Sequence, residues 1–341
     1  MSPAVSVLLF LAGLVVTVKG ADWLTDGASA LAGRMGVSTL VIGLTVVAFG
    51  TSAPELAVSC LAAARGQGDM SIGNVVGSNI FNASAIMGLT ALVHPVVCTK
   101  DNIRYDVPLC LLAAIVLACL VRGGNGLVRT DGIVLLCLLA VFLSYTLSIA
   151  RGQRSAANPC LACGRGRAMT RSAGARQAAP SENFSAQAMS VGRAILLTLV
   201  GLAFLVVGGE CFVGGATGIS RWLGVSEATI ALTIVAAGTS LPELVTSVLA
   251  ARKGDTAMAL GNVVGSIVLN TFLVLGAAAV IHPLPAGDIC PIDLLVFLAV
   301  AAFLWVFCRF GDRKARLINR GEGTLLLVLA VAYYAYTVIT A

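Results

Sequence analysis

Charged residues are scarce in this chain of 341 residues, of which only 11% are Asp, Glu, Lys or Arg. A soluble globular domain carries about 25% charged residues, so the scarcity excludes an ordinary water-soluble fold. Apolar residues take their place, at 58% of the chain, and give a mean hydropathy of +0.96. We therefore interpret the chain as a membrane protein.

Apolar segments long enough to cross a bilayer recur through the whole chain. A hydrocarbon core of about 30 Å takes about 20 helical residues. The sequence predicts an all-α polytopic membrane protein with ten transmembrane helices, at residues 4–31, 37–65, 70–93, 104–121, 129–150, 191–216, 225–252, 256–281, 289–308 and 323–340. A transmembrane β-barrel would need short segments that alternate apolar and polar residues, and the continuous apolar runs 135–143 and 294–307 exclude it.

The distribution of basic residues predicts the orientation of the chain in the membrane. The N-terminus lacks the basic region of a signal peptide, so we interpret it as the first span. Most basic residues then share one side, including six arginines in the polar stretch 151–188. We expect an integral plasma-membrane protein, in the inner membrane of a Gram-negative cell, with both termini outside and the central loop cytoplasmic. The net charge of +6 reflects this topology and the cytoplasmic lipid leaflet, and not nucleic-acid binding.

Soft-metal and redox chemistry have little support in the sequence. Most of the ten cysteines lie in predicted spans, where they act as small apolar residues. Cys160 and Cys163 form a single CxxC pair, without the second pair or the histidines that a zinc or redox site would need. His94 and His282 lie near span ends, where we expect them to cap turns.

The chain contains an internal repeat. At an offset of 188 residues, AFGTSAPELAVSCLAAARGQGDMSIGNVVGSNIFN from Ala48 aligns with AAGTSLPELVTSVLAARKGDTAMALGNVVGSIVLN from Ala236, with 20 of 35 positions identical. Each half has an odd number of spans, so the second half enters the membrane from the opposite side. Inverted repeats are typical of transporters that bind their substrate at the bilayer midplane. We expect a first repeat at 1–150, a linker loop at 151–188 and a second repeat at 189–341.

A glutamate lies near the middle of the second span and another near the middle of the seventh. Placing one ionised acid at the bilayer centre costs about 2.5 to 3.5 kcal/mol on insertion scales. Salt bridges would need basic residues at the same depth as Glu55 and Glu243, and the spans offer essentially only Lys19. A bound cation is therefore the better partner for the two carboxylates.

The residues around both glutamates favour a hard cation. Pro54 and Pro242 lack an N–H, so each helix should open around Gly50 and Gly238 and free main-chain oxygens. Four-residue spacing puts more oxygen groups on one face of two successive spans, in the order Thr51, Glu55, Ser59 and Asn74, Ser78, Asn82, and the pattern recurs 188 residues later. Ca²⁺ takes about six to eight oxygen ligands of this mixed kind, whereas softer metals would need thiolate or imidazole groups.

The first and sixth spans are predicted to pack against each other closely. Gly20 and the pair Gly208–Gly209 remove side-chain bulk from both, which permits helices to slide in contact. Asp22 and Glu210 lie in the same spans, and we interpret them as solvated groups near helix ends in preference to guides for ions.

The paired blocks GTSAPEL with GNVVGSNIFN, and GTSLPEL with GNVVGSIVLN, resemble the two α-repeats of the cation/calcium antiporter superfamily, and above all its sodium/calcium exchangers. The resemblance implies a secondary active antiporter, not an enzyme, that exchanges Ca²⁺ for Na⁺ without a cofactor or an obligate protein partner. It assigns Glu55 and Glu243 as shared carboxylates and Thr51 and Thr239 as further calcium ligands. It also implies sodium ligands at Ser52, Ser78, Ser240 and Ser266 and at the main-chain oxygens of Ala48 and Ala236. Asn82 and Asn270 correspond to the position at which the family has an amide or an acid.

Two positions depart from the family's pattern. Some archaeal-type and potassium-dependent relatives carry aspartate where this chain has Asn270, so the chain resembles the potassium-independent exchangers. Ile267 stands where the first repeat has Asn79, and we attach no consequence to it. Two alternatives stay open: a Ca²⁺/H⁺ antiporter of the same superfamily, in which protons replace sodium, and a cation channel. The sequence GTS favours sodium, because proton-coupled relatives tend to have GN there.

Overall fold

The computed structural model describes residues 2–124, 126–157, 189–223, 236–286, 291–311 and 316–340. In the first half the helices, with π-helical segments marked η, are α1 (Pro3–Met35), α2 (Thr39–Ile42), η1 (Gly43–Val47), α3 (Ala48–Thr51), α4 (Ala53–Ala64), α5 (Gly68–Phe81), η2 (Asn82–Ile86), α6 (Met87–Val93), η3 (Asn102–Asp106), α7 (Val107–Gly124) and α8 (Arg129–Ala157). In the second half they are α9 (Val191–Trp222), α11 (Ala236–Thr239), α12 (Leu241–Arg252), α13 (Thr256–Leu269), η6 (Asn270–Val274), α14 (Leu275–Ile281), α15 (Pro291–Phe310) and α16 (Arg320–Thr340).

The predicted spans correspond to helices of the structure. Among the described residues, eight helices are long and apolar enough to cross a membrane, and the bent pair 39–51 and 53–64 makes a ninth. These nine match predicted spans one to six and eight to ten. The seventh, at 225–252, lies partly outside the described residues, and its described part consists of α11 and α12. The all-α polytopic membrane fold is confirmed.

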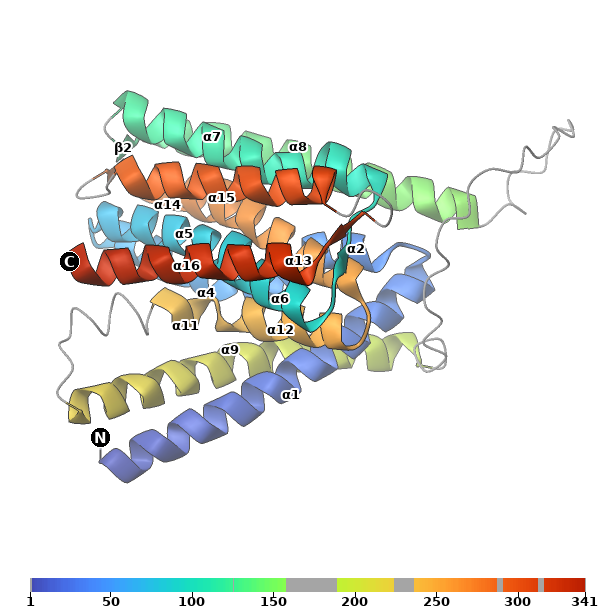
Figure 1. Cartoon of the computed structure of the whole chain (residues 1–341), viewed down its shortest axis with the longest axis horizontal. Helices are drawn as coiled ribbons and strands as arrows, with labels where there is room; N and C mark the ends of the chain where they lie inside the picture. Colours follow the sequence, from blue (N-terminus) through green and yellow to red (C-terminus); the bar gives the residue numbers. More distant parts are fainter. Residues whose placement is uncertain are drawn as a thin grey trace, which may run out of the picture.

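Two short antiparallel ladders show how the halves are related. The strand β1 (Val96–Val97) pairs with β4 (Leu317–Ile318), and β2 (Gly126–Leu127) pairs with β3 (Leu284–Pro285). Each ladder joins the strand after one half's third span to the strand before the other half's last span. In Figure 1, β2 lies at the left end of the bundle, where N and C are marked, and the dark red strand β4 lies at the right end. The two halves are therefore equivalent but inverted.

The helices α1 and α9 lie side by side along one face of the bundle (Figure 1). Glycines recur every seven residues along their contact, at 13, 20 and 27 in α1 and at 201, 208 and 215 in α9. A Cβ atom on Gly20 would lie 2.7 Å from the Leu205 nitrogen, and one on Gly208 would lie 2.6 Å from the Thr17 nitrogen. Only glycine permits this approach, so the predicted close contact of the first and sixth spans is confirmed.

A salt bridge connects α1 to the end of α12. The Nζ of Lys253 lies 2.7 Å from Asp22 Oδ1 and 2.7 Å from Asp26 Oδ1. Asp22 was predicted to be a solvated group, and it is instead half-buried in this ion pair. Nearby, Asp255 caps α13 and accepts a hydrogen bond from Thr39 Oγ1 at 2.8 Å. These contacts join α1 and α2 to the turn between α12 and α13, which connects the seventh and eighth spans.

The most buried spans are the third and the eighth, formed by α5–α6 and α13–α14. Both stay helical through their polar residues because the apolar neighbours, such as Ile72, Ile80 and Val264, fill the core between the halves. The helices α4 and α12 pack against them. The polar stripes predicted from the sequence therefore lie at the centre of the bundle, where each polar group needs a partner.

Candidate cation site

The second and seventh spans are broken at equivalent serines. Ser52 has φ −82° and ψ 5°, and Ser240 has φ −88° and ψ 8°, outside the helical region. The first break bends its span by 46°. The sequence placed the opening near Gly50, two residues earlier. The break comes later because Pro54 lies in the first turn of α4, where a helix needs no N–H.

Each break places a glutamate in the first turn of the next helix. Glu55 in α4 and Glu243 in α12 are both fully buried. The N-terminal end of a helix favours negative charge, which partly offsets the cost of their burial. Within the described residues neither carboxylate forms a salt bridge, and Lys19 lies near Asp22 and is 61% exposed. Lys19 is therefore not the partner of either glutamate.

The two breaks face each other across the halves. Ser52 Oγ donates to Glu243 Oε1 at 3.1 Å, and Ser240 Oγ donates to Glu55 Oε1 at 3.2 Å. Each carboxylate is thus held by a hydroxyl of the opposite half. Both carboxylates are completely buried. Two buried acids that share one set of hydrogen bonds require a positive charge or protons to neutralise them.

The threonines next to the breaks add to the same cluster. Thr239 lies near the Glu55 carboxylate, and Thr51 lies near that of Glu243. Thr51 Oγ1 also lies 3.2 Å from Asn262 Oδ1. Residues 51, 52, 55, 239, 240 and 243 therefore form one buried group that neither half could build alone.

Several buried polar groups of the predicted ligand set have no hydrogen-bond partner among the described residues. They are one carboxylate oxygen each of Glu55 and Glu243, the hydroxyls of Ser78 and Ser266, and the side-chain amides of Asn82 and Asn270. An unpaired buried polar group costs about 1–3 kcal/mol, so native proteins rarely leave many together. The residues fit a bound cation, because its coordination would satisfy these oxygens at once.

Both predicted asparagine ligands begin a π-helical segment, which the sequence did not predict. Asn82 is the first residue of η2, and Asn270 is the first residue of η6. A π-turn shifts the main-chain hydrogen bonds by one residue and is frequent at functional sites. The α5 helix that leads to Asn82 contacts α4 and α11, and α13 contacts α12 and α3. The segments that carry Ser78, Asn82, Ser266 and Asn270 therefore belong to the two spans that pack against the broken helices.

The two predicted main-chain ligands begin short helices. The carbonyl of Ala48 accepts from the Ser52 N–H at 2.9 Å and from Thr51 Oγ1 at 3.3 Å. Ala236 is the first residue of α11. Whether these oxygens bind sodium stays a prediction.

The sequence identified one important polar residue without assigning it to the site. Asn262 belongs to the predicted polar stripe, and its Nδ2 donates to the Glu243 carbonyl at 3.3 Å and to Ser247 Oγ at 2.9 Å. In the first half, Asn74 donates to Ser59 at 3.0 Å in the same way. Their four-residue spacing was the signal, and these bonds connect the third and eighth spans to the broken helices.

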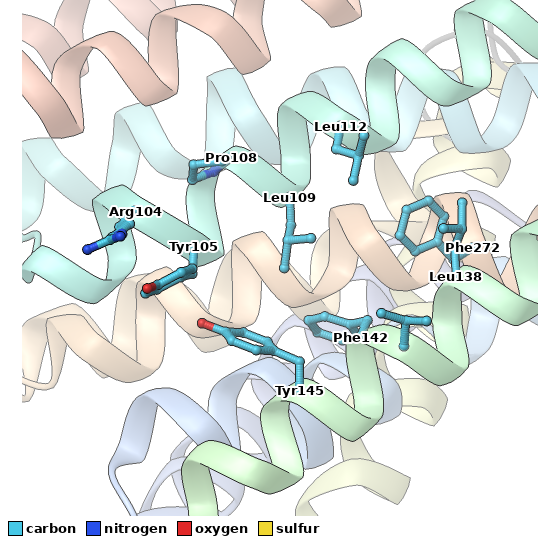
Figure 2. Close-up of a pocket in the computed structure, with 10 residues that line it drawn as sticks. Arg104, Tyr105, Pro108, Leu109, Leu112, Leu138, Phe142, Tyr145 and Phe272 are labelled. Atoms are coloured by element: carbon cyan, nitrogen blue, oxygen red, sulfur yellow. The ribbon is translucent and has the colours of Figure 1, made fainter.

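A pocket of about 450 Å³ lies away from this site, between α7 and α8 (Figure 2). Figure 2 shows Arg104, Tyr105 and Tyr145 at one end and Phe272 with Leu138 at the other. The lining is almost wholly apolar and includes none of the predicted cation ligands. An apolar lining offers a cation no ligands, so this pocket is not the candidate site.

The two histidines and the CxxC pair are the remaining residues that the sequence analysis discussed. The Nδ1 atoms of His94 and His282 lie 3.1 Å and 2.8 Å from the carbonyls of the prolines that follow, at the ends of α6 and α14. These contacts agree with the predicted turn-capping role, which stays a prediction. Cys160 and Cys163 lie outside the described residues.

An inverted repeat around a buried, oxygen-rich site defines a membrane antiporter for cations, and not an enzyme. A family model described as sodium/calcium exchanger protein matches residues 5–148 and 193–339. The chain therefore belongs to the sodium/calcium exchanger family.

Two relatives and one solved structure are similar over nearly the whole chain. Inner membrane protein YrbG of Escherichia coli K12 is 35% identical over 324 residues, which cover 93% of this chain and 92% of YrbG. Sodium/calcium exchanger MaX1 of Methanosarcina acetivorans is 32% identical over 96% of this chain and 97% of its own length. A structure of the sodium-calcium exchanger NCX_Mj, soaked with Na⁺ and Sr²⁺, superposes with a TM-score of 0.79 at 32% identity, covering 98% of this chain and 99% of that one.

Proposed function

We propose that this protein exchanges Ca²⁺ for Na⁺ by opening one midplane site alternately to the two sides of the membrane. The observation that carries the proposal is the reciprocal pairing of Ser52 with Glu243 and Ser240 with Glu55. It joins two acids of opposite halves into one buried group with unpaired oxygens. The names of MaX1 and NCX_Mj, which are sodium/calcium exchangers, support the same choice of ions.

Competition for the same oxygens supplies the coupling in this proposal. Two ionised glutamates give a formal charge of about −2, which one Ca²⁺ or a set of Na⁺ ions neutralises. An unfilled site would expose two bare acids to a dry interior during the transition, which is costly. Only the protein with an occupied site therefore changes between the two conformations, and the gradient of one ion drives transport of the other.

The proposed site consists of the twelve residues that the sequence indicated. The acids Glu55 and Glu243 bind both ions, Thr51 and Thr239 complete the calcium shell, and the other oxygens serve Na⁺ or either ion. The proposed architecture is a repeat at 1–150, a cytoplasmic linker at 151–188 and a repeat at 189–341. We also propose that both termini lie outside the plasma membrane, as the basic residues favour.

Calcium uptake into liposomes tests the choice of counter-ion. The purified protein is reconstituted with Na⁺, K⁺ or a buffered acid inside, and ⁴⁵Ca²⁺ uptake is followed after dilution into choline medium. We expect uptake with internal Na⁺ and background uptake with K⁺. Equal uptake with a pH gradient alone would contradict sodium exchange and favour Ca²⁺/H⁺ antiport. Uptake independent of any internal ion would indicate a channel.

A further inference from the structure

A hydrogen bond joins the two most buried spans next to the candidate site. The Nδ2 of Asn79, in α5, donates to Thr271 Oγ1, in η6, at 2.9 Å. Both side chains are completely buried. Thr271 Oγ1 in turn donates to the Ile267 carbonyl at 2.9 Å. Asn79 follows Ser78, and Thr271 follows Asn270, so the bond ties together the chain segments that carry two of the proposed ligands.

This bond occurs once, where the repeat would allow it twice. At the offset of 188 residues, Asn79 aligns with Ile267 and Ala83 aligns with Thr271. The equivalent pair, Ile267 and Ala83, is apolar and cannot form the bond. The two mismatches therefore belong together, because each supplies one partner of a bond between the halves. The sequence showed the first mismatch, but only the structure gives it a consequence.

The bond fixes the segment that presents Asn270. A π-turn is less regular than an α-helix, so side-chain contacts decide where its first residues lie. In η6 the second residue, Thr271, is held from the opposite half by Asn79. In η2 the equivalent second residue is Ala83, whose methyl group cannot form a hydrogen bond. The amide of Asn270 is thus positioned relative to α5, whereas that of Asn82 has no such tie from the other half.

The same bond orients Asn79 itself. Its Nδ2 donates to Thr271, and its Oδ1 is buried without a partner in the part of the chain that the structure describes. We propose that Asn79 and Thr271 form a positioning pair that holds Ser78 and Asn270 at the spacing a cation needs. The proposal rests on the function proposed above. In this proposal the pair increases the affinity of the site for the ion and does not affect the rate of the conformational change.

Isosteric variants separate this role from a general structural one. Thr271→Val and Asn79→Leu each remove one partner at nearly constant volume, and Thr271→Ser keeps the hydroxyl. Thr90→Val is the matched control, because Thr90 is also fully buried but its hydroxyl has no partner. We expect the first two variants to raise the half-saturating Ca²⁺ concentration about five- to ten-fold, with the maximal rate within about two-fold of wild type. The Ser variant and the control should behave as wild type.

The double variant provides the decisive comparison. If Asn79 and Thr271 act through one bond, Asn79→Leu with Thr271→Val should be no worse than either single variant. Additive effects, an unchanged half-saturating concentration, or an equal effect of Thr90→Val would overturn the proposal.

A binding measurement keeps the test independent of transport. Ca²⁺ is titrated into each solubilised variant and the melting temperature is measured. The quantity compared is the Ca²⁺ concentration that gives half of the maximal increase in melting temperature. Wild-type protein that is stabilised by Ca²⁺ but shows no sodium-driven uptake would refute the exchange function alone. The positioning pair would still be supported by the same five- to ten-fold shift in this concentration, and refuted without it.

Discussion

The two halves of the molecule form matching hydrogen bonds at the candidate site and different contacts near the ends of the surrounding helices, which we call the rims of the site. At the site, the Ser52–Glu243 and Ser240–Glu55 distances are 3.1 Å and 3.2 Å. At one rim, Lys253 is paired with Asp22 and Asp26. Its equivalents at the other end are Arg65, Glu210 and Gly214, and no ion pair joins them among the described residues.

The last two spans of each half differ in a similar way. Tyr333 and Asp293, in α16 and α15, are joined by a hydrogen bond of 2.9 Å. In the first half the Tyr145 hydroxyl and Asp106 Oδ1 are both buried, and neither has a partner among the described residues. Tyr145 aligns with Tyr333 at the offset of 188, whereas Asp106 and Asp293 are one position out of register near the start of the fourth span of each half.

Comparison of the two halves indicates which contacts should be the same in both halves and which should differ. An ion bound between two equivalent halves needs matched ligands from both, so the site is symmetric. A transporter open to one side at a time needs different contacts at its two ends, so the rims are asymmetric. Contacts at the rims that are present in only one half, such as that of Lys253, are therefore the ones expected to change when the site opens to the other side.

Neutralising either glutamate should have the largest effect. Glu55→Gln and Glu243→Gln each remove a charged ligand, which costs about 3 kcal/mol or about 100-fold in calcium-driven exchange. Because the site is symmetric, the two variants should lose similar amounts of ⁴⁵Ca²⁺ uptake in liposomes. Glu210→Gln, in an exposed acid of α9, is the control. Normal transport by either site variant would show that the site is wrongly assigned.

Filling the glycine contact between α1 and α9 should have the next largest effect. A Cβ on Gly20 would meet main-chain atoms of α9 within 3 Å, and one on Gly208 would lie 2.6 Å from the Thr17 nitrogen in α1. We expect Gly20→Val and Gly208→Val each to destabilise the protein by about 1–3 kcal/mol, seen as a lower melting temperature and less monodisperse protein. At Gly33, where a Cβ would meet nothing within 4 Å, Val should be tolerated. Equal losses at all three positions would contradict the close contact.

Removing the Lys253 ion pair should change exchange without abolishing it. Half-exposed ion pairs contribute up to about 1 kcal/mol, equivalent to about five-fold in a rate. We expect Lys253→Met to change the rate of exchange by about two- to five-fold. Arg65→Met, the equivalent change at the other rim, should leave the rate unaltered. Identical rates for both variants and wild type would remove the rim asymmetry from the mechanism.

The tyrosines should give the smallest effect. Tyr333→Phe removes a hydrogen bond of the kind that contributes about 0.6 kcal/mol between membrane helices. Tyr145→Phe removes a buried hydroxyl that has no partner, so it should be neutral or slightly stabilising. Melting temperatures of the solubilised variants check the difference. A larger loss from Tyr145→Phe than from Tyr333→Phe would reverse the comparison.

Much of the architecture follows from local chemistry and could be predicted from the sequence. Runs of apolar residues have no stable alternative to a membrane helix, and an odd number of spans per half makes the repeat inverted. The acids Glu55 and Glu243 stand out because burying charge is costly wherever the helices pack. Their location in spans two and seven did not depend on any long-range contact.

The tertiary structure decided which groups face each other. The pairing of each serine with the opposite glutamate, and of Asn79 with Thr271, joins residues about 190 positions apart, which no local pattern encodes. The exact place of the breaks, at Ser52 and Ser240, depended on how Pro54 and Pro242 fit the first turn of the next helix. Repetition made the halves chemically alike, and packing around one shared centre made the site symmetric and its rims different.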